Sequence, residues 1–530
     1  MNTNSVTSTT SVLIAGGGPV GLALAVELGL RGVDCVLVEK RDGVISVPKM
    51  SQVSSRNMES CRRWGIAEAI KSATWSADFP MDFLYVTNLT GREIARLKVP
   101  SYVERGEIKT TPEGARHCPQ TYFDPILVAR ASEIEAISLR YNTRLDGFVQ
   151  TEDGVTAQIT DMESGASETI SAQYLVGCDG PDGVVRKALG IELGGEGVIA
   201  NSTNIFFKSP GLASLHDKGW ARFYRPIDEN GCWGELIPID GGELWRLTIF
   251  HEDEIPEDPD IYLARMAGME FDYEIQSILP WERRDYVAES YRDGRVFIAG
   301  DAAHQCSPTG GYGMHTGLVE AVNLGWKLWA TLAGWGGSGL LDSYETECRA
   351  LARYIVTNAT AAFEEVTGLP GLAGVDTDAA VRDFNTFLQE SSNNSVSAVA
   401  ENVKSYFSYW NSPICLMSET DDPEPDPTKL SPSTIPGSPA PHAWLAPGKS
   451  TLDLFQGQFT LFSFGADAGP LLAAAELRGV PIELIEPDDA AIADLYERKL
   501  VLVRPDAFVA WRGDECPADV GAVIDQVCGA

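Results

Sequence analysis

The stretch Val12–Lys40, VLIAGGGPVGLALAVELGLRGVDCVLVEK, decides the fold of the first part of the chain. A short apolar run ends at three glycines, apolar residues then recur at helical spacing, and a second apolar run ends at an acidic residue. This order predicts a strand, a tight turn, a helix and a second, parallel strand. The same unit opens the dinucleotide-binding α/β domains.

The turn in this stretch has the pattern Gly-x-Gly-x-x-Gly, formed by Gly16, Gly18 and Gly21. The first glycine permits the tight turn, the second lets backbone approach a pyrophosphate, and the third lets helix and strand pack closely. Glu39 lies at the spacing at which an acid accepts hydrogen bonds from a ribose. The pattern predicts dinucleotide binding, with a purely structural glycine turn as the alternative, and by itself it does not separate NAD from FAD.

Composition excludes several classes of function. The 530 residues predict two or three domains. A net charge of −34 disfavours nucleic acid or an anionic membrane as the main partner. The ten cysteines and six histidines are scattered without CxxC or HxxxH spacing, which indicates a reducing compartment and no metal site. With a polar N-terminus and no apolar run long enough for a membrane span, we expect a cytoplasmic protein.

Two further stretches extend the argument. Tyr174–Gly190 reads YLVGCDGPDGVVRKALG, and Gly294–Leu328 reads GRVFIAGDAAHQCSPTGGYGMHTGLVEAVNLGWKL. In each, a strand-like run ends at a Gly/Asp pair, and a helical pattern follows. With the glycine turn, and in this order, they resemble the class A flavoprotein aromatic hydroxylases, the family with the para-hydroxybenzoate hydroxylase fold. The resemblance covers residues 11 to about 355 directly.

The resemblance implies that the dinucleotide is FAD. It places the ADP half on the glycine turn and Glu39, Asp301 near the ribityl or pyrophosphate region, and the loop 310–314 along the isoalloxazine edge. A surface arginine and a capping glutamine remain the alternatives for Arg56 and Gln120. The implied cofactor residues are Gly16, Gly18, Pro19, Gly21, Glu39, Lys40, Arg56, Gln120, Asp179, Gly300, Asp301, Pro308, Gly311, Gly313 and Met314.

The chain departs from the family pattern at several positions. His315 stands where the family usually has Asn, and Glu320 where it usually has Asp. Two readings of His315 stay open, a residue packed near the flavin and an acid–base group. Ser51 aligns where some phenol hydroxylases carry a catalytic Asp, so the group that activates the phenol does not follow from those relatives.

The predicted fold class is α/β: a Rossmann-like FAD domain, an inserted antiparallel-sheet substrate domain and a C-terminal thioredoxin-like α/β domain. PGSPAPHAWL and VRPDAFVAWR resemble the C-terminal domain of the larger phenol-hydroxylase branch. Without CxxC we expect packing or a homodimer contact there, not redox activity. The predicted ranges are 1–80, 113–195 and 285–370 for FAD, 81–112 and 196–284 for substrate, 371–417 for a helical segment, 418–442 for a linker and 443–530 for the last domain.

The resemblance implies a monooxygenase that uses NADH or NADPH and O2 to hydroxylate a phenolic or related aromatic substrate through a flavin hydroperoxide. Alternatives on the same fold are Baeyer–Villiger oxidation, epoxidation and polyketide oxidation. Alternatives of other classes are an NAD-dependent dehydrogenase and a non-catalytic flavin sensor or scaffold. An ionised phenol needs a nearby cation or base. The catalytic candidates are Tyr224, Arg246, Pro308 and His315, with Arg222, Arg225 and His251 as further candidates.

Overall fold

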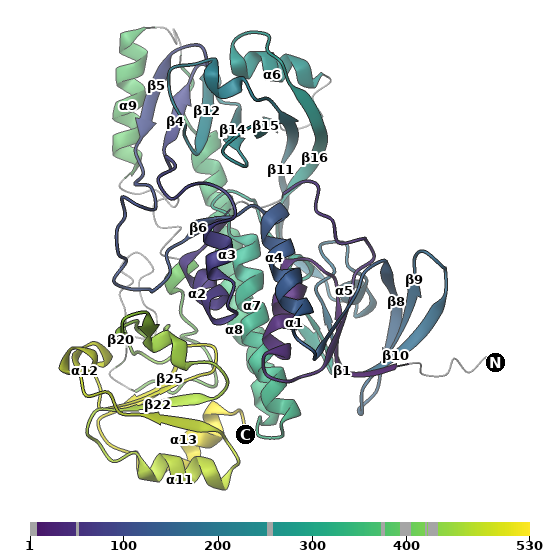
Figure 1. Cartoon of the computed structure of the whole chain (residues 1–530), viewed down its shortest axis with the longest axis vertical. Helices are drawn as coiled ribbons and strands as arrows, with labels where there is room; N and C mark the ends of the chain where they lie inside the picture. Colours follow the sequence, from purple (N-terminus) through teal and green to yellow (C-terminus); the bar gives the residue numbers. More distant parts are fainter. Residues whose placement is uncertain are drawn as a thin grey trace.

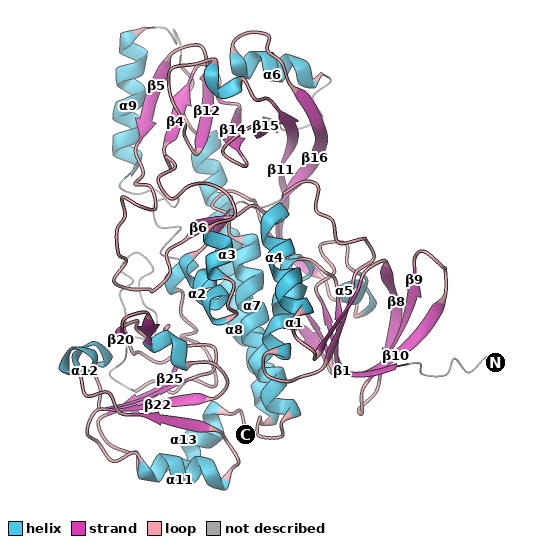
Figure 2. Ribbon diagram, viewed as in Figure 1, coloured by secondary structure: helices cyan, strands magenta, loops and turns pink. Residues whose placement is uncertain are grey.

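The computed structural model describes residues 8–48, 52–251, 258–372, 377–392, 404–418, 421 and 433–530. Three sheets organise the molecule, and long helices run between them (Figure 1). Figure 2 shows one sheet above the long helices, another beside them on the right, and the C-terminal unit at the lower left. The predicted α/β fold class is confirmed. In the described part of the chain, no helix is long and apolar enough to cross a membrane.

The first sheet has the order β17-β18-β10-β1-β2-β7, and β8 and β9 extend it from β10. Helix α1 (Pro19–Gly29) joins β1 to β2, which lie parallel, so the strand–helix–strand prediction is confirmed. The strands are β1 (Ser8–Ala15), β2 (Cys35–Val38), β7 (Ile137–Arg140), β8 (Thr143–Gln150), β9 (Val155–Asp161), β10 (Ser167–Gly177), β17 (Arg292–Asp293) and β18 (Val296–Ile298).

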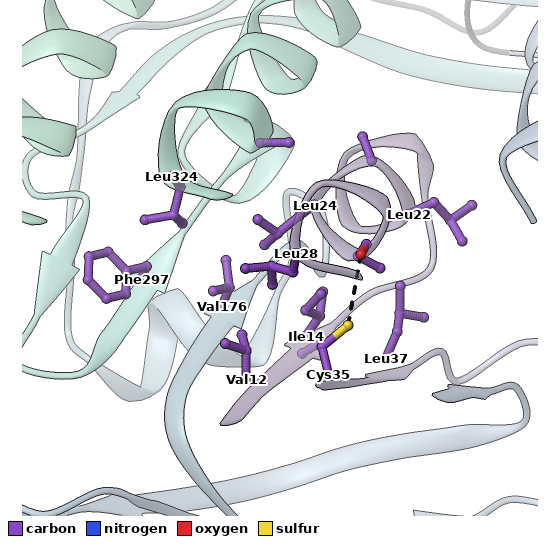
Figure 3. Packing of buried hydrophobic residues seen from close by; sticks show 14 of the residues in the cluster. Val12, Ile14, Leu22, Leu24, Leu28, Cys35, Leu37, Val176, Phe297 and Leu324 are labelled. Carbon is purple, nitrogen blue, oxygen red and sulfur yellow. Dashed lines mark hydrogen bonds between the residues drawn. The ribbon is translucent and has the colours of Figure 1, made fainter. Parts of the chain in front are cut away.

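The core of this domain lies between the first sheet and its helices. Val12 and Ile14 of β1 face Leu24 and Leu28 of α1 across an apolar interface (Figure 3). Helix α7 (Gly313–Leu332) packs on the other side of α1, so α1 is buried on nearly its whole circumference. Parallel strands covered on both faces have to be apolar throughout, which explains the continuous apolar runs in the sequence.

The second sheet has the order β19-β16-β11-β15-β14-β12-β4-β5. The meander predicted at 219–250 is confirmed, although its first strand begins at Phe223. The long strands β11 and β16 pair antiparallel and connect this sheet to the first domain (Figure 1). The strands are β4 (Phe83–Val86), β5 (Glu93–Leu97), β11 (Leu193–Lys208), β12 (Phe223–Asp228), β13 (Gly231–Cys232), β14 (Gly234–Pro238), β15 (Leu244–His251), β16 (Glu274–Ala288) and β19 (His304–Gln305).

Most of the remaining helices pack on these two sheets. The small strands β3 (Gln52–Val53) and β6 (Arg116–His117) pair with each other. Of the predicted helical segment 371–417, residues 373–376 and 393–403 lie outside the described residues, as do 419–420 and 422–432 of the predicted linker. The helices are α2 (Ser55–Arg63), α3 (Ala67–Lys71), α4 (Gln120–Ser132), α5 (Val184–Ala188), α6 (Pro259–Ala267), α8 (Ser338–Thr367) and α9 (Asp378–Ser392).

The C-terminal unit is a third sheet with the order β23-β22-β24-β25. Strands β22 and β23 are parallel, and β24 and β25 continue the sheet antiparallel. All ten cysteines of the chain are free thiols. The elements are β20 (Trp444–Ala446), β21 (Lys449–Ser450), β22 (Phe459–Ser463), β23 (Ile482–Ile485), β24 (Leu500–Val503), β25 (Val509–Gly513), α11 (Gly469–Leu477), α12 (Ala490–Tyr496) and α13 (Val520–Val527).

Candidate active site

A cavity of about 2170 Å³ lies between the carboxyl ends of the first sheet and one face of the second sheet. Ligands of open α/β sheets bind at this end of the strands. Three residues singled out in the sequence, Gly21, Arg56 and Tyr224, do not line it. The candidates that do line it are Gly16, Gly18, Pro19, Glu39, Lys40, Gln120, Asp179, Gly300, Asp301, Pro308, Gly311, Gly313, Met314, Arg222, Arg225, Arg246, His251 and His315.

The glycine turn is shaped by close backbone contacts. Gly16 has φ +111°, and a Cβ there would lie 2.2 Å from the carbonyl oxygen of Cys178. A Cβ on Gly21 would lie 2.1 Å from the carbonyl oxygen of Gly16, so Gly21 acts through packing and not through the cavity. A Cβ on Gly18 would meet no protein atom within 4 Å, and Gly18 caps α1 without a side-chain hydrogen bond. The backbone of Gly18, at the start of α1, is therefore open to the approach of a pyrophosphate.

Glu39 holds the same turn from the end of β2. One carboxylate oxygen accepts a hydrogen bond from the Gly17 N–H at 2.8 Å, and the other accepts from the Arg41 N–H at 3.0 Å. Glu39 is mostly buried and lines the cavity. Oε1 also accepts from the Arg41 Nε at 3.2 Å. Oε2 can accept a second hydrogen bond, so the side chain can brace the turn and also accept from a ribose hydroxyl.

Helix α7 points its N-terminus at the cavity. Its N-cap Tyr312 makes no side-chain capping bond, and Gly310 and Gly311 of the preceding loop have φ +83° and +68°. Positive φ at both residues turns the loop so that Gly313 and Met314 line the cavity at the helix start. A helix start without a side-chain cap, at the positive end of the helix dipole, suits a ring that gains negative charge on reduction.

Glu320, on the next turns of α7, anchors the second Gly/Asp turn. Its Oε2 accepts from the Gly300 N–H at 2.7 Å, and its Oε1 lies 3.2 Å from the His304 Nε2. Both side chains are fully buried. Burial opposes the charged imidazole, but the adjoining Glu320 carboxylate raises the pKa of His304. The pair ties α7 to the turn that presents Asp301 to the cavity.

His315 is a buried, neutral hydrogen-bonding group. Its Nδ1 accepts from the Asn57 side-chain amide at 3.0 Å and from the Ser54 N–H at 3.3 Å. Because Nδ1 accepts, the proton is on Nε2, and the ring presents an N–H donor. Burial, with the charges of Lys404 and Arg222, holds the pKa of His315 well below its usual range. This arrangement favours the packing interpretation over the acid–base interpretation.

Gln120 and Asp124 form a buried pair on α4. The Gln120 amide, on the cavity wall, donates to the Asp124 Oδ2 at 3.0 Å. Burial raises the pKa of Asp124 to about 7, and its Oδ1 has no hydrogen-bond partner among the described residues. Sequence reasoning found Gln120 but missed Asp124, which lies one helical turn further on.

The second sheet contributes side chains to the cavity wall. Successive side chains of a strand point to opposite faces of the sheet, so every second residue faces the cavity. Arg246 of β15 pairs in register with Phe206 and Ile237, and its guanidinium faces the cavity. Arg246 makes no ion pair within the described ranges, and its buried Nε lacks a hydrogen-bond partner there. Burial lowers the pKa of Arg246. Arg225, in contrast, binds Glu235 at 3.0 Å.

Arg283 of β16 is a second buried cation of this face, and the sequence analysis missed it. It donates to the Ser202 Oγ at 2.9 Å, the Ser307 Oγ at 3.0 Å and the Thr309 Oγ1 at 3.2 Å. Burial among these neutral hydroxyls lowers the pKa of Arg283 to about 9. Arg283 holds the loop around Pro308. This role depends on contacts between segments far apart in the sequence, so no local motif indicated it.

Three candidates have other surroundings. Tyr224 lies in the core of the second sheet, where its hydroxyl donates to the Gly219 carbonyl at 2.8 Å and accepts from the Ala221 N–H, so the structure does not bring it to the cavity. Its hydrophobic neighbours select this face of β12. Arg56 lies against the C-terminal unit, its guanidinium 4.7 Å from the centre of the Phe508 ring. Ser51 lies outside the described residues.

Comparison with known proteins identifies the family. Residues 9–359 match the FAD binding domain family, and residues 433–530 match the C-terminal domain of aromatic-ring hydroxylases. The FAD-dependent monooxygenase apdD of Emericella nidulans is 31% identical over 98% of this chain and 90% of its own length. Tetracenomycin B2 monooxygenase-dioxygenase of Streptomyces olivaceus is 31% identical over 97% of each chain.

Solved structures agree with these sequence relatives. The rebeccamycin biosynthetic enzyme RebC with reduced flavin has a TM-score of 0.91 and 38% identity, covering 98% of this chain and 99% of RebC. Aklavinone-11 hydroxylase with FAD and aklavinone has a TM-score of 0.83 and 28% identity, covering 100% of both chains. The chain belongs to the FAD-dependent aromatic-ring hydroxylases and is a flavoprotein monooxygenase. The uncapped starts of α1 and α7 and the open space over Gly18 fit FAD.

Proposed function

We propose that this monooxygenase hydroxylates a multi-ring phenolic substrate of the polyketide type, with NAD(P)H as reductant and O2 as oxidant. The observation that carries the proposal is the cavity of about 2170 Å³, which continues from the glycine turn onto the second sheet. A site for one drug-sized ligand is roughly 300–1,000 Å³. This cavity has room for a dinucleotide and a fused-ring substrate together. The named substrate of one structural relative, aklavinone, supports this class.

The chain's own residues have separate parts in this proposal. Gly16, Gly18 and Glu39 hold the adenosine and pyrophosphate end of FAD, and the start of α7 holds the ring end. When bound, FAD supplies electron transfer from NAD(P)H and activation of O2. The walls of both sheets exclude bulk water from the reacting atoms.

Arg246 is the residue we propose to stabilise an ionised substrate oxygen. Its guanidinium lines the cavity and forms no salt bridge among the described residues, and the charge of Glu235 favours its ionised form, so it offers a positive charge to a ligand. A phenolate is more electron-rich at its ring carbons than a phenol, and a fixed cation beside the oxygen favours the phenolate. Arg225 is less suitable because Glu235 already neutralises it.

The test is NAD(P)H consumption in air by the FAD-loaded protein, with and without a panel of anthraquinone and naphthol phenols, followed by mass analysis of the products. We expect at least one fused-ring phenol to accelerate consumption and to gain one oxygen atom. Acceleration that yields only hydrogen peroxide would contradict hydroxylation of that compound. A ring-expanded or epoxide product would establish the alternative reaction on the same fold. Cytoplasmic location and a homodimer stay predictions.

A further inference from the structure

The C-terminal unit contacts the helices that carry the flavin end of the cavity. The turn between β24 and β25, residues 504–508, projects from the third sheet toward α2 and α8. It is a tight turn: the Arg504 N–H donates to the Phe508 carbonyl at 2.7 Å, and Ala507 has φ +66°. A non-glycine residue in the left-handed region needs surroundings that hold it there.

Arg504 connects this turn to α7 through one carboxylate. Its guanidinium donates both Nη groups to Glu347 of α8, at 2.6 and 3.0 Å. The same carboxylate accepts from Asn323 at 2.6 Å and from Lys327 at 2.7 Å, and both of these residues lie on α7. All four side chains are buried. Arg504 and Lys327 favour the charged form, so the pKa of Glu347 is held well below its usual range.

Phe508 connects the same turn to the first turn of α7. The Arg56 guanidinium lies 4.7 Å from the centre of the Phe508 ring. The next residue of α2, Asn57, is the donor to the His315 Nδ1 at 3.0 Å. Phe508 also shares one buried cluster with Tyr312, the residue that caps α7 and lines the cavity.

The contacts made by Arg504 and Phe508 hold α7 at two positions along its axis. One acts at His315 and Tyr312, where the helix begins, and the other acts at Asn323 and Lys327, two to three turns further on. A helix held at two levels by a third domain cannot shift along or rotate about its axis without breaking buried polar bonds.

Electrostatics supports docking in a single geometry. Within the buried network, two cations, Arg504 and Lys327, face two carboxylates, Glu347 and Asp506. Removing one member leaves an uncompensated buried charge, so the domain interface is intolerant of displacement. At the rim, Arg62 of α2 donates to Asp453 at 2.7 and 2.9 Å.

We infer that the C-terminal domain is a positioning element of the flavin site: its turn 504–508 sets the position of the first turn of α7 and of the loop 310–314. The inference rests on the FAD binding of the proposed function. It assigns the domain a part in catalysis although the domain contributes no side chain to the cavity wall.

The test compares two phenylalanines of the same domain in the full-length holoprotein. Phe508→Ala removes the ring under Arg56, whereas Phe462→Ala removes a fully buried ring from the opposite face of the domain, in the cluster with Tyr496. The measurements are the FAD dissociation constant, the visible circular dichroism of bound flavin and the melting temperature. We expect Phe508→Ala to raise the FAD dissociation constant at least tenfold and to change the flavin dichroism. We expect Phe462→Ala to lower only the melting temperature.

Equal flavin affinity and dichroism in the two variants would overturn the inference, whatever their melting temperatures. Phe508→Leu keeps the apolar bulk and removes only the ring face, and it serves where Phe508→Ala does not yield soluble protein. An unchanged dissociation constant and spectrum in that variant would overturn the inference equally. Failure of the proposed function is a separate outcome, because wild-type protein would then bind no FAD or show no phenol-stimulated NAD(P)H oxidation.

Discussion

The two walls of the cavity are built in different ways. The wall on the first sheet consists mainly of backbone: glycine turns, the uncapped starts of α1 and α7, and one brace from Glu39. The wall on the second sheet consists of side chains that alternate along strands, among them Arg246, Thr248 and Arg283. Backbone sites need glycine at fixed spacing and leave a motif in the sequence. Side-chain sites need only the right face of a strand and leave none.

Gly16→Ala is the strongest test of the backbone wall. The new Cβ would lie 2.2 Å from the Cys178 carbonyl oxygen. We expect FAD affinity to fall more than about 1000-fold, about 4 kcal/mol, measured by flavin fluorescence. Gly32→Ala is the matched control, because Gly32 has φ +74° but open space around it. Comparable loss of FAD in both variants would show that backbone strain, and not the close contact, shapes the turn.

Asp124→Asn tests a charge that this wall buries. Burial raises the pKa of Asp124 in the folded protein to about 7 from its ordinary value of 3.8. Between these two pH values the folded state keeps a proton that the unfolded state has lost. Stability from this group is therefore present at low pH and lost as pH rises through 7. Above pH 7 we expect the free energy of unfolding of the Asp124→Asn apoprotein to be larger than that of wild type by up to about 4 kcal/mol.

Urea unfolding of both apoproteins between pH 4 and 8 measures this difference. The difference should shrink as the pH falls from 7 toward 4, because the carboxyl group of the unfolded chain then takes up a proton as well. A difference that is independent of pH would show that Asp124 is not the titrating group.

Arg246→Met tests the side-chain wall. If the guanidinium stabilises an ionised substrate oxygen, kcat/KM falls about 100-fold, or about 2.7 kcal/mol, while FAD binding is unchanged. Arg265→Met is the control, since Arg265 pairs with Asp228 on the outside of the same domain and does not line the cavity. The measurement is the steady-state kcat/KM of both variants with the phenol of the panel that stimulates wild type most. Equal losses of kcat/KM in the two variants would remove Arg246 from the proposal.

His315→Asn tests the junction of the two walls and should have the smallest effect. Asn also offers an N–H donor and an acceptor, and the family usually carries Asn here, so we expect kcat/KM to fall less than about tenfold. Because the His315 pKa is well below 6.5, the imidazole stays neutral near pH 7. The pH profiles of wild type and variant should therefore have the same shape. Loss of an ionisation near neutral pH in the variant would revive the acid–base interpretation.

Much of the flavin wall could be predicted because its determinants are local. A glycine turn, a following helix and an acid after the next strand lie within 30 residues, and local sterics specify them. The predictions for Pro19, Gly300 and Gly313 rested on such segments, and all three residues line the cavity. Among the sheet candidates, Arg246 lines the cavity and Tyr224 does not, because the core selects the buried face of β12.

The sequence by itself determined the α/β class, the family and the cofactor, since spacing of glycines, acids and apolar runs is a property of the chain. Tertiary structure alone decided that His315 accepts from Asn57, 258 residues away. It alone decided that Arg504 reaches Glu347, 157 residues away, and that Arg56 faces Phe508 instead of the cavity. These contacts depend on how separate domains dock, and burial and charge pairing at the interface select that docking after the local motifs have formed.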